Sequence, residues 1–548
     1  MEAHDISRGI IQRFQKSFPK LAESRWETKP PVKPVKTEGP TGWPWGLKIK
    51  EIFRATRSKG PRYPAKESFS PHQPPRIFQA MSTLSAPLSS EPSASEPIVS
   101  ISGLRGIVGQ QLRPEAVARY VMIACSLWQK GPIVLSRDSR PSGAIFRHAA
   151  LAALMGCGRE VIDIGIAPTP TVGIVIRRLG AAGGVQISGS HNPPDQNGIK
   201  LLDENGKMLP PALAEAVKDR YFSAFQAYSQ PPHVPGKCTS FPMATLWHLR
   251  AVEELVDVDR VRRQGFRVVL DANGGAGGPL GIRLLEDLGC QVFGIGTLPD
   301  GNFHHPPEPL PENLGEVAAQ VAKLGADLGF CQDPDADRLV IIDSSGQCLS
   351  EEHTLSICLD HILRSRKGPV VINCATSMVN EWIAAQYGVE CIRVPVGEAN
   401  VVQGMLRHRA VFGGEGNGGP IDPRVGFIRD SFLGMALVLE AMASQGVSVR
   451  ELVNRFPPCV MKKLKLPLPP GSLGAVFARL RAAFPTAQVD TSDGLRLSWT
   501  DRWLLCRASN TEPILRIIAE AQSPEALDEL CGKAQSVVQE AIATPPAD

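Results

Sequence analysis

Residues 328–342 read Leu-Gly-Phe-Cys-Gln-Asp-Pro-Asp-Ala-Asp-Arg-Leu-Val-Ile-Ile. Three carboxylates, Asp333, Asp335 and Asp337, alternate in this stretch, with apolar runs on both sides. Alternate side chains of an extended backbone share a face, so the three carboxylates can converge on one hard cation. The apolar flanks favour an acidic loop embedded between two strands; a solvated acidic turn is the alternative.

The acidic loop does not fit a calcium-binding EF-hand. That loop needs Gly at its sixth position and Glu at its twelfth, whereas this chain has Arg338 and Ser344 there. Mg²⁺ fits better, because it commonly binds a few carboxylates together with phosphate oxygens. We therefore expect one Mg²⁺ per chain at the three aspartates.

Short apolar runs alternate with helical patterns from Pro97 onward, which predicts an α/β fold. A helix is expected from Pro114, and strands are expected at residues 133–135, 268–270, 292–294, 370–372 and 391–394. Three strands run directly into polar or Gly-rich phrases, at residues 188–193, 333–338 and 413–419. Ligands of open α/β sheets bind beyond the carboxyl ends of strands, so these loops are expected to surround one cleft.

Length and charge composition reduce the number of possible functions. The 548 residues are too many for one hydrophobic core. The net charge of +4 is uneven, because residues 1–80 hold 16 Lys and Arg against 7 Asp and Glu, and the remainder holds 43 against 48. Nucleic-acid binding is therefore not expected for the main body.

Cysteine spacing and hydropathy indicate in which cellular compartment the protein is expected. The twelve cysteines show no C-x-x-C pair, so neither a disulfide framework nor a zinc site is indicated. No apolar run reaches the roughly 20 residues that span a bilayer, and the N-terminus lacks the apolar core of a signal peptide. We expect a cytoplasmic protein without a membrane partner.

A second phrase, residues 189–193, offers a hydroxyl that can carry a phosphoryl group. Gly189 permits a tight backbone and Pro193 ends regular structure, so the Ser190 hydroxyl should project from a fixed loop. An ordinary polar turn is the alternative. Lys200 follows closely enough in the sequence for its charged amino group to approach this loop. Together with the acidic loop, the phrase indicates a phosphoryl-transfer enzyme.

Further cationic phrases have two interpretations each. Residues 507–513, followed by Arg516, combine a guanidinium, hydroxyls and an amide, as in a phosphate cradle or an ordinary polar strand connection. Arg105, Arg137 and Arg140 stand near Gly turns and are either site residues or exposed arginines.

In this order, the phrases at 189–193, 333–338, 415–419 and 507–513 resemble the α-D-phosphohexomutase family, which includes phosphoglucomutase, phosphomannomutase and phosphoglucosamine mutase. The resemblance covers about residues 98–540 and implies three related α/β domains with mixed sheets plus a smaller C-terminal α+β domain around a central cleft. The expected units are a disordered leader at 1–96, domain I with a phosphoserine loop at 97–245, domain II with a metal loop at 246–347, domain III with a sugar-binding loop at 348–455, and domain IV with a phosphate-binding loop at 456–548. Within the Pro-, Ser- and Lys-rich leader, Met81 is a candidate for the true translation start.

The resemblance also implies roles for individual residues. Ser190 would be the phosphoserine and would join Asp333, Asp335 and Asp337 in holding Mg²⁺. The catalytic groups near the transferred phosphate would be Arg105, His191, Lys200 and Arg338. The substrate-binding residues would be Glu398, Glu415, Asn417, Arg507, Ser509, Asn510, Thr511 and Arg516.

The implied reaction interconverts hexose 1-phosphate and hexose 6-phosphate through a 1,6-bisphosphate intermediate, with a glucose-1,6-bisphosphate-type activator and a monomer or homodimer as the assembly. Many family members carry Gly-Glu-x-Ser-Gly-His in the sugar loop, but residues 414–419 here read Gly-Glu-Gly-Asn-Gly-Gly. Pro334 and Asn510 also replace glycines often found in the family. The sugar thus stays open between glucosamine, mannose and glucose phosphates. A non-catalytic sugar-phosphate-binding homologue and a serine-dependent sugar phosphatase are the alternative functions.

Overall fold

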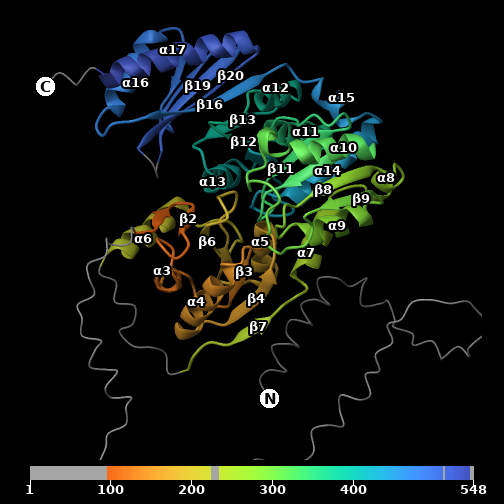
Figure 1. Ribbon diagram of the computed structural model, residues 1–548, viewed down its shortest axis with the longest axis vertical. Coiled ribbons are helices and arrows are strands. Elements are labelled where there is room, and N and C mark those ends of the chain that lie inside the picture. Colours follow the sequence, from red (N-terminus) through yellow and green to blue (C-terminus); the bar gives the residue numbers. More distant parts are fainter. Residues whose placement is uncertain (1–95, 224–233, 510–512, 544–548) are drawn as a thin grey trace, which may run out of the picture. The chain divides into compact units, whose positions relative to one another are not determined.

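The computed structural model describes residues 96–223, 234–509 and 513–543, which all lie in the unit Ala94–Asp548. Within these residues the chain forms four β-sheets with helices packed against each of them (Figure 1). The first three sheets mix parallel and antiparallel strands, and the fourth is antiparallel throughout. The predicted α/β class with a C-terminal α+β domain is confirmed.

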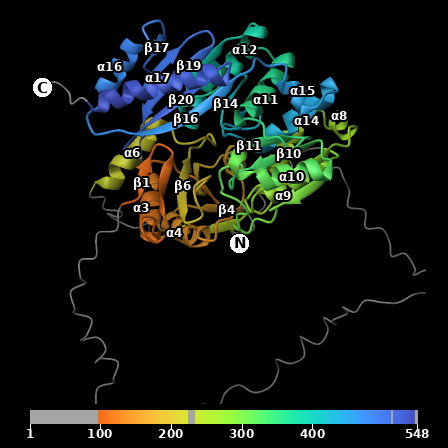
Figure 2. The same ribbon diagram turned by 45° about the horizontal axis from the view of Figure 1, so that its top comes forward.

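The first sheet has seven strands in the order β1-β2-β6-β5-β3-β4-β7. Its strands are β1 (Ile98–Ser100), β2 (Gly103–Ile107), β3 (Ile133–Arg137), β4 (Val161–Ile166), β5 (Gly183–Ile187), β6 (Gln196–Leu202) and β7 (Cys238–Ser240). Helices α3 (Pro114–Cys125), α4 (Gly143–Gly156) and α6 (Pro211–Phe222) bury apolar side chains against Ile133, Leu135 and Val185. Helix α5 (Thr169–Leu179) packs on the opposite face, where its Ile176 lies against Gly184. Figure 2 shows α3 and α4 side by side.

The second sheet has the order β11-β10-β8-β9. Its strands are β8 (Arg267–Asp271), β9 (Gln291–Ile295), β10 (Leu328–Gln332) and β11 (Leu339–Asp343). Helix α10 (Gly315–Leu324) forms a core with Val269, Cys331 and Val340 on one face, and α9 (Gly278–Asp287) packs on Leu270 of the other face. The connecting helices are α7 (Ala244–Glu253), α8 (Val258–Arg262) and the 3₁₀ turn η1 (Pro311–Asn313).

The third sheet has the order β13-β12-β14-β15. Its strands are β12 (Val370–Asn373), β13 (Cys391–Val394), β14 (Phe412–Glu415) and β15 (Gly419–Ile421). Helix α13 (Glu398–His408) packs its Val401 and Met405 on Val371 of the sheet. Helices α11 (Glu351–Ser365) and α14 (Ser431–Gln445) also contact this sheet, and α12 (Val379–Gln386) and α15 (Val449–Val453) contact α11.

One topological feature recurs in the three mixed sheets. In each, a parallel strand is followed at its carboxyl end by a tight loop and an antiparallel neighbour: β5 by β6, β10 by β11, and β14 by β15. These connecting loops contain the Ser190, Asp333 and Glu415 phrases that the sequence singled out. Each of the three phrases with candidate functional residues thus connects a buried parallel strand to an antiparallel neighbour.

The fourth sheet has the order β16-β20-β19-β18-β17. Its strands are β16 (Val460–Pro467), β17 (Gln488–Asp490), β18 (Leu495–Ser498), β19 (Arg502–Ala508) and β20 (Ile514–Ala521). Helices α16 (Leu473–Ala483) and α17 (Pro524–Ala543) lie together against the sheet and build its core, as Figure 1 shows. Strands β18 and β19 form a hairpin, and α17 is the last helix of the described residues.

Most predicted strands agree with the structure, including those at 133–135, 268–270 and 391–394. The helix predicted from Pro114 begins there but ends at Cys125, so Trp128 lies beyond it. Trp128 nevertheless packs in the core of the first sheet, where its indole N–H donates to the carbonyl of Leu202 at 3.1 Å. The predicted leader spans residues 1–96, of which residues 1–95, including the candidate start at Met81, lie outside the described residues.

Candidate active site

Hydrogen bonds to buried side chains hold the backbone of the loop that carries Ser190. The Ser190 φ of 50° lies in the left-handed region, which a non-glycine residue adopts only where surrounding contacts enforce it. The Ser190 backbone N–H donates to Ser188 Oγ at 2.8 Å, and Ser188 Oγ in turn donates to Asp138 Oδ2 at 2.8 Å. Asp138 is fully buried. The hydroxyl of Ser190 is therefore presented on a loop of fixed conformation.

Arg140 completes this support. Its guanidinium donates to the carbonyls of Ser190 at 2.8 Å, Asn192 at 2.5 Å and Gln196 at 3.1 Å. A Cβ on Gly189 would lie 2.7 Å from Arg140 Nε, so only glycine allows the loop to pack this closely. Arg140 is 1% exposed, so the alternative of an exposed arginine is excluded.

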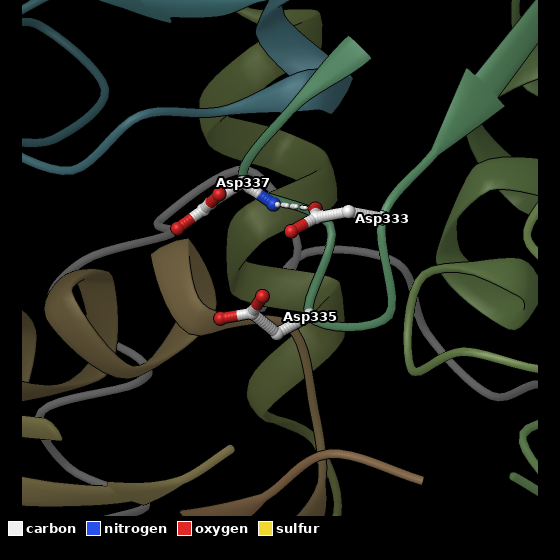
Figure 3. Close-up of side chains that lie close together, drawn as sticks. All are labelled: Asp333, Asp335 and Asp337. Carbon is white, nitrogen blue, oxygen red and sulfur yellow. Dashed lines mark hydrogen bonds between the residues drawn. The ribbon is translucent and has the colours of Figure 1, made fainter. Parts of the chain in front are cut away.

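The three aspartates lie on one loop between β10 and β11, and Figure 3 shows their carboxylates gathered there. All three are buried, and one oxygen of each lies within 4.8 Å of the others. Asp333 Oδ1 accepts from the backbone N–H groups of Asp337 and Arg338, both at 3.1 Å. The alternative of a solvated acidic turn is therefore excluded.

Hydrogen bonding in the cluster leaves oxygens available for a metal. Lys200 Nζ donates to Asp335 Oδ2 at 2.5 Å and to Asp337 Oδ2 at 3.1 Å, and Thr169 Oγ1 also donates to Asp335 Oδ2. The other oxygens, Asp335 Oδ1 and Asp337 Oδ1, are buried without a hydrogen-bond partner. Buried carboxylate oxygens without donors are costly unless a cation binds them. The residues present thus fit a divalent oxygen-ligated ion such as Mg²⁺.

The three carboxylates and the cations around them shift one another's pKa. Burial raises the pKa of Asp333 well above its ordinary value, and the nearby Asp337 and Asp335 raise it further. Burial alone would raise the pKa of Asp337, but Arg429, Lys200 and Arg338 outweigh it and hold that pKa below its ordinary value. Three mutually repelling carboxylates of this kind gain most from a nearby divalent charge.

Ser190 Oγ lies beside the metal loop. It is 3.2 Å from Asp333 Oδ2 and 3.4 Å from His191 Nδ1. Burial lowers the pKa of His191 well below its ordinary value, and the positive charges of Arg338 and Arg105 lower it further, so the imidazole is neutral. The structure therefore brings together the predicted phosphoserine, the predicted metal ligands and a neutral imidazole.

Two predicted arginines flank this centre. Arg105 Nη1 donates to Asn192 Oδ1 at 3.4 Å, next to the serine loop. Arg338 Nη1 is 3.4 Å from Glu308 Oε1, and Glu308 Oε1 also lies 3.9 Å from His191 Nε2. His191 and Glu308 line a cavity of about 470 Å³ together with Phe303, His305 and Asn313. Glu308 was not singled out from the sequence, because a lone carboxylate in a Pro-rich stretch carries no spacing signal.

The region of the third sheet contributes Glu398 at the start of α13, Glu415 at the end of β14, and Asn417 in the loop before β15. Arg429, which the sequence analysis missed, joins two of them: its Nε donates to Glu398 Oε2 at 2.8 Å and its Nη1 lies 3.0 Å from Glu415 Oε2. Burial raises the pKa of Glu398 to about 7. Glu398 Oε1 and Asn417 Oδ1 are buried without a hydrogen-bond partner, so both remain acceptors for a ligand.

The fourth sheet carries the predicted phosphate-binding residues. Arg507 on β19 lies opposite Arg516 on β20, and Arg516 lies opposite Lys465 on β16. Like charges on directly opposite strand positions are destabilising, and an anion among them removes the repulsion. Arg507 Nε is 3.4 Å from Asp493 Oδ1, and Asp493 Oδ2 accepts from Val396 N at 2.8 Å. Ser509 directly follows β19, whereas Asn510 and Thr511 lie outside the described residues.

Comparison with known families identifies the class of protein. Models of the phosphoglucomutase/phosphomannomutase domains match successive parts of the chain: alpha/beta/alpha domain I at residues 98–227, domain II at 247–346, domain III at 350–459, and the C-terminal domain at 464–534. The chain belongs to the phosphoglucomutase/phosphomannomutase family, which confirms the resemblance inferred from its four phrases.

Individual relatives agree with this assignment. The chain is 34% identical to a phosphoglucomutase/phosphomannomutase of Thermococcus kodakarensis, over 80% of this chain and 98% of the relative. It is 32% identical to a probable phosphoglucosamine mutase of Methanopyrus kandleri, over 80% and 97%. A crystal structure of a family protein from Burkholderia thailandensis covers 82% of this chain and 99% of its own, with a TM-score of 0.69 and 26% identity. The protein is thus a phosphohexomutase, an isomerase.

Two findings concern the expectations about membrane spans and disulfide bonds. The structure contains no helix, among the residues it describes, that is long and apolar enough to cross a membrane. All twelve cysteines lie in described parts of the chain, and each is a free thiol.

Proposed function

We propose that Ser190, phosphorylated on Oγ, is the group that donates and recovers the phosphoryl group in the mutase reaction. The free hydroxyl oxygen of a hexose monophosphate attacks the phosphorus, the bond from phosphorus to Ser190 Oγ breaks, and the proton of the sugar hydroxyl passes to a base. The product is a hexose 1,6-bisphosphate and an unmodified Ser190. After the bisphosphate turns round, Ser190 Oγ loses its proton to the base and attacks the other phosphorus. The bond from that phosphorus to the sugar oxygen breaks, the sugar oxygen takes up a proton, and the isomeric monophosphate leaves phosphorylated Ser190 behind. The observation that carries this proposal is the 3.2 Å separation of Ser190 Oγ and Asp333 Oδ2.

Asp333, Asp335 and Asp337 would hold Mg²⁺, with Ser190 Oγ or its phosphate as a further ligand. The ion would supply positive charge that offsets the nearly two negative charges of a phosphoserine, which otherwise repels an anionic substrate. Lys200 keeps two of these carboxylates in place through the contacts described above. Burial alone would lower the pKa of Lys200, but Asp335 and Asp337 outweigh it and raise that pKa, so the side chain stays charged.

The groups around Ser190 have separate tasks in this scheme. His191, neutral and 3.4 Å from Ser190 Oγ, can accept or return a proton at Nδ1. The guanidinium groups of Arg105 and Arg338 stabilise the charge on the transferring phosphoryl oxygens. Transfer depends mainly on alignment and electrostatic stabilisation, which a loop of fixed conformation favours.

The other end of the substrate would be held by the third and fourth sheets. Glu398, Glu415 and Asn417 accept hydrogen bonds from the sugar hydroxyls. Arg507, Ser509, Asn510, Thr511 and Arg516 grip the phosphate that does not react, and the like-charged row on three adjacent strands, which adds Lys465, supports an anion there. Closure of this domain over the substrate would exclude water, which would otherwise hydrolyse the phosphoserine.

The sugar loop lacks the hydroxyl and imidazole of many relatives, so glucosamine, mannose and glucose phosphates all remain candidate substrates. A glucose-1,6-bisphosphate-type activator would load Ser190 before the first turnover. A monomeric or homodimeric assembly in the cytoplasm, acting on free hexose phosphates, remains our expectation.

The test combines intact mass with an assay panel. The purified protein, incubated with Mg²⁺ and glucose 1,6-bisphosphate, should gain one phosphate, and it should then isomerise at least one of the three hexose 1-phosphates. Ser190→Ala should remove both properties while circular dichroism stays unchanged. Ser223→Ala, at an exposed serine that follows α6, is the control and should keep both. Full activity of Ser190→Ala would disprove the proposal, and release of inorganic phosphate in place of an isomer would indicate a phosphatase.

A further inference from the structure

Arg429 connects the metal loop, the start of α13 and the end of β14 through a single guanidinium. Its Nη2 donates to Asp337 Oδ2 at 2.8 Å, its Nε to Glu398 Oε2 at 2.8 Å, and its Nη1 lies 3.0 Å from Glu415 Oε2. The side chain is 10% exposed. A guanidinium offers five N–H donors in a rigid planar fork, so it can hold three carboxylates at once, which the point charge of a lysine cannot do with the same geometry.

The contacts of Arg429 fix one oxygen of each carboxylate. At Asp337 and Glu398 the second oxygens, Oδ1 and Oε1, are buried and have no hydrogen-bond partner. At Glu415 the second oxygen, Oε1, accepts from Asn373 Nδ2 at 2.8 Å and from Gly397 N at 3.1 Å. One oxygen without a protein donor thus belongs to Asp337, a predicted metal ligand, and the other to Glu398, a predicted sugar-binding residue. Arg429 binds the second oxygen of each of these two carboxylates.

Arg429 itself has little freedom to move. The next residue, Asp430, caps α14 by accepting from the N–H groups of Phe432 at 2.9 Å and Leu433 at 3.2 Å, and it also bonds His248 Nε2 at 2.8 Å. A Cβ on Gly419 would lie 2.3 Å from Arg429 Cδ, so the side chain passes over glycine in close contact. A displacement of either carboxylate must therefore be shared with the other through the guanidinium.

We propose that Arg429 is a positioning residue that makes metal binding and sugar binding depend on each other. The inference rests on the proposed function of the same site. With a metal ion bound, Asp337 would be held in place and would in turn hold Arg429, so that Glu398 would keep its free oxygen available to a sugar hydroxyl. The same coupling works in reverse, because the effect of one ligand on the affinity of the other is reciprocal at equilibrium. An ion-pair network that served stability alone would leave the two affinities independent of this residue.

The test measures the coupling directly. Mg²⁺ is titrated calorimetrically into dephosphorylated protein, which cannot turn over, with and without saturating hexose 6-phosphate chosen from glucosamine, mannose and glucose. In the wild type we expect the sugar phosphate to tighten Mg²⁺ binding by about tenfold, within the usual range of coupling between sites. In Arg429→Lys the factor should fall below about twofold. Arg424→Gln, which removes a partly exposed arginine paired with Asp422, is the matched control and should keep the wild-type factor.

The outcomes separate the two proposals. A wild-type coupling factor that persists in Arg429→Lys overturns the role of Arg429 and leaves the proposed function standing. Failure of all three sugar phosphates to bind the wild type overturns both. Glu398→Gln is the second variant in case Arg429→Lys does not fold, because it keeps Arg429 but removes the charge that Arg429 holds on the sugar side. It should reduce the coupling factor, and an undiminished factor would again overturn the inference.

Discussion

Glu520, on a strand of the fourth sheet, accepts a hydrogen bond of 2.8 Å from the backbone N–H of Met378, at the start of α12 beside the third sheet. The same carboxylate accepts from Ser377 Oγ and, at 2.5 Å, from the indole N–H of Trp503. A negative charge is favourable at a helix N-terminus, where the first backbone N–H groups have no partner within the helix. One buried carboxylate therefore attaches the C-terminal domain to α12.

Glu520→Ala should weaken this attachment, because it leaves the N–H groups of Met378 and Trp503 without an acceptor in a buried site. We expect a loss of about 2 to 3 kcal/mol in the free energy of unfolding, measured in urea, together with faster amide exchange at the start of α12. Glu529→Ala, at an exposed position of α17, is the control and should leave both unchanged. Unchanged exchange at α12 in Glu520→Ala would contradict the attachment.

Addition of Mg²⁺ should stabilise the protein through the aspartate cluster. At 100 times the dissociation constant, the expected gain is about 2.7 kcal/mol, or a rise of several degrees in Tm. Asp337→Asn should abolish the rise, because it removes charge from a ligand whose Oδ1 has no partner in the protein. Asp259→Asn, on an exposed aspartate, should retain it. The same Mg²⁺-dependent rise in both variants would place the ion elsewhere.

Gly416→Ala should impair substrate binding, since a Cβ there would lie 1.9 Å from Oε2 of the buried Glu352. The sugar loop must move to avoid this contact, so we expect KM for hexose phosphate to rise by about tenfold or more, a loss of roughly 1.4 kcal/mol in binding. Glu352→Ala should restore part of the affinity in the double variant by providing space. Gly474→Ala, where a Cβ meets nothing within 4 Å, is the control. A normal KM in Gly416→Ala would show that this loop does not contact the sugar.

His353 should make stability depend on pH. Burial, with a smaller contribution from Arg450, lowers the pKa of His353 from 6.5 to about 4, and its Nδ1 has no hydrogen-bond partner. The unfolded chain therefore binds the proton more readily than the folded protein does. The stabilisation is complete above about pH 6.5 and is lost as the pH falls towards 4, by up to roughly 3 kcal/mol.

Urea unfolding at several pH values between 4 and 7 measures this effect. In His353→Gln the part of the pH dependence that comes from this group should disappear, whereas His148→Gln, at a more exposed histidine of α4, should retain it. An identical pH dependence in wild type and His353→Gln would contradict the assignment.

Arg507→Met should weaken binding of hexose phosphate by about tenfold to a hundredfold in KM, as expected for the loss of a charge-assisted hydrogen bond to phosphate. The effect should decrease at high salt, because exposed charges are screened. Arg502→Met, on the same strand but paired with Asp501, is the matched control and should leave KM near the wild-type value. Equal KM values in the two variants would argue against a phosphate site on β19.

Local patterns in the sequence predicted much of this protein. The alternation of apolar runs with helical periodicity predicted the α/β fold, and the polar phrases after Ile187 and Gln332 predicted where two functional loops leave their strands. The end expected after Phe412 is wrong, because β14 continues to Glu415. The other predictions succeed because a buried strand and the turn that ends it are specified by neighbouring residues. The aspartate triad was recognisable for the same reason.

Residues whose role depends on distant neighbours were not recognisable. Arg429 has no motif of its own, and it matters because Asp337, Glu398 and Glu415 converge on it from other parts of the chain. Arg140 was noted but left undecided, because only the fold buries it beneath the serine loop. Thr169 and Lys465 likewise became candidates through contacts across the fold or across strands.

The sequence by itself determined the kinds of element, the positions of the loops and the chemical groups that these loops carry, since periodicity, glycines and carboxylate spacing are local properties. Only the tertiary structure decided which groups face each other, such as Ser190 and Asp333, and which carboxylate oxygens are left without a protein donor. The physical reason is that burial and long-range contact set the charge balance and the hydrogen bonding of a site, and both arise only when segments far apart in the chain pack together.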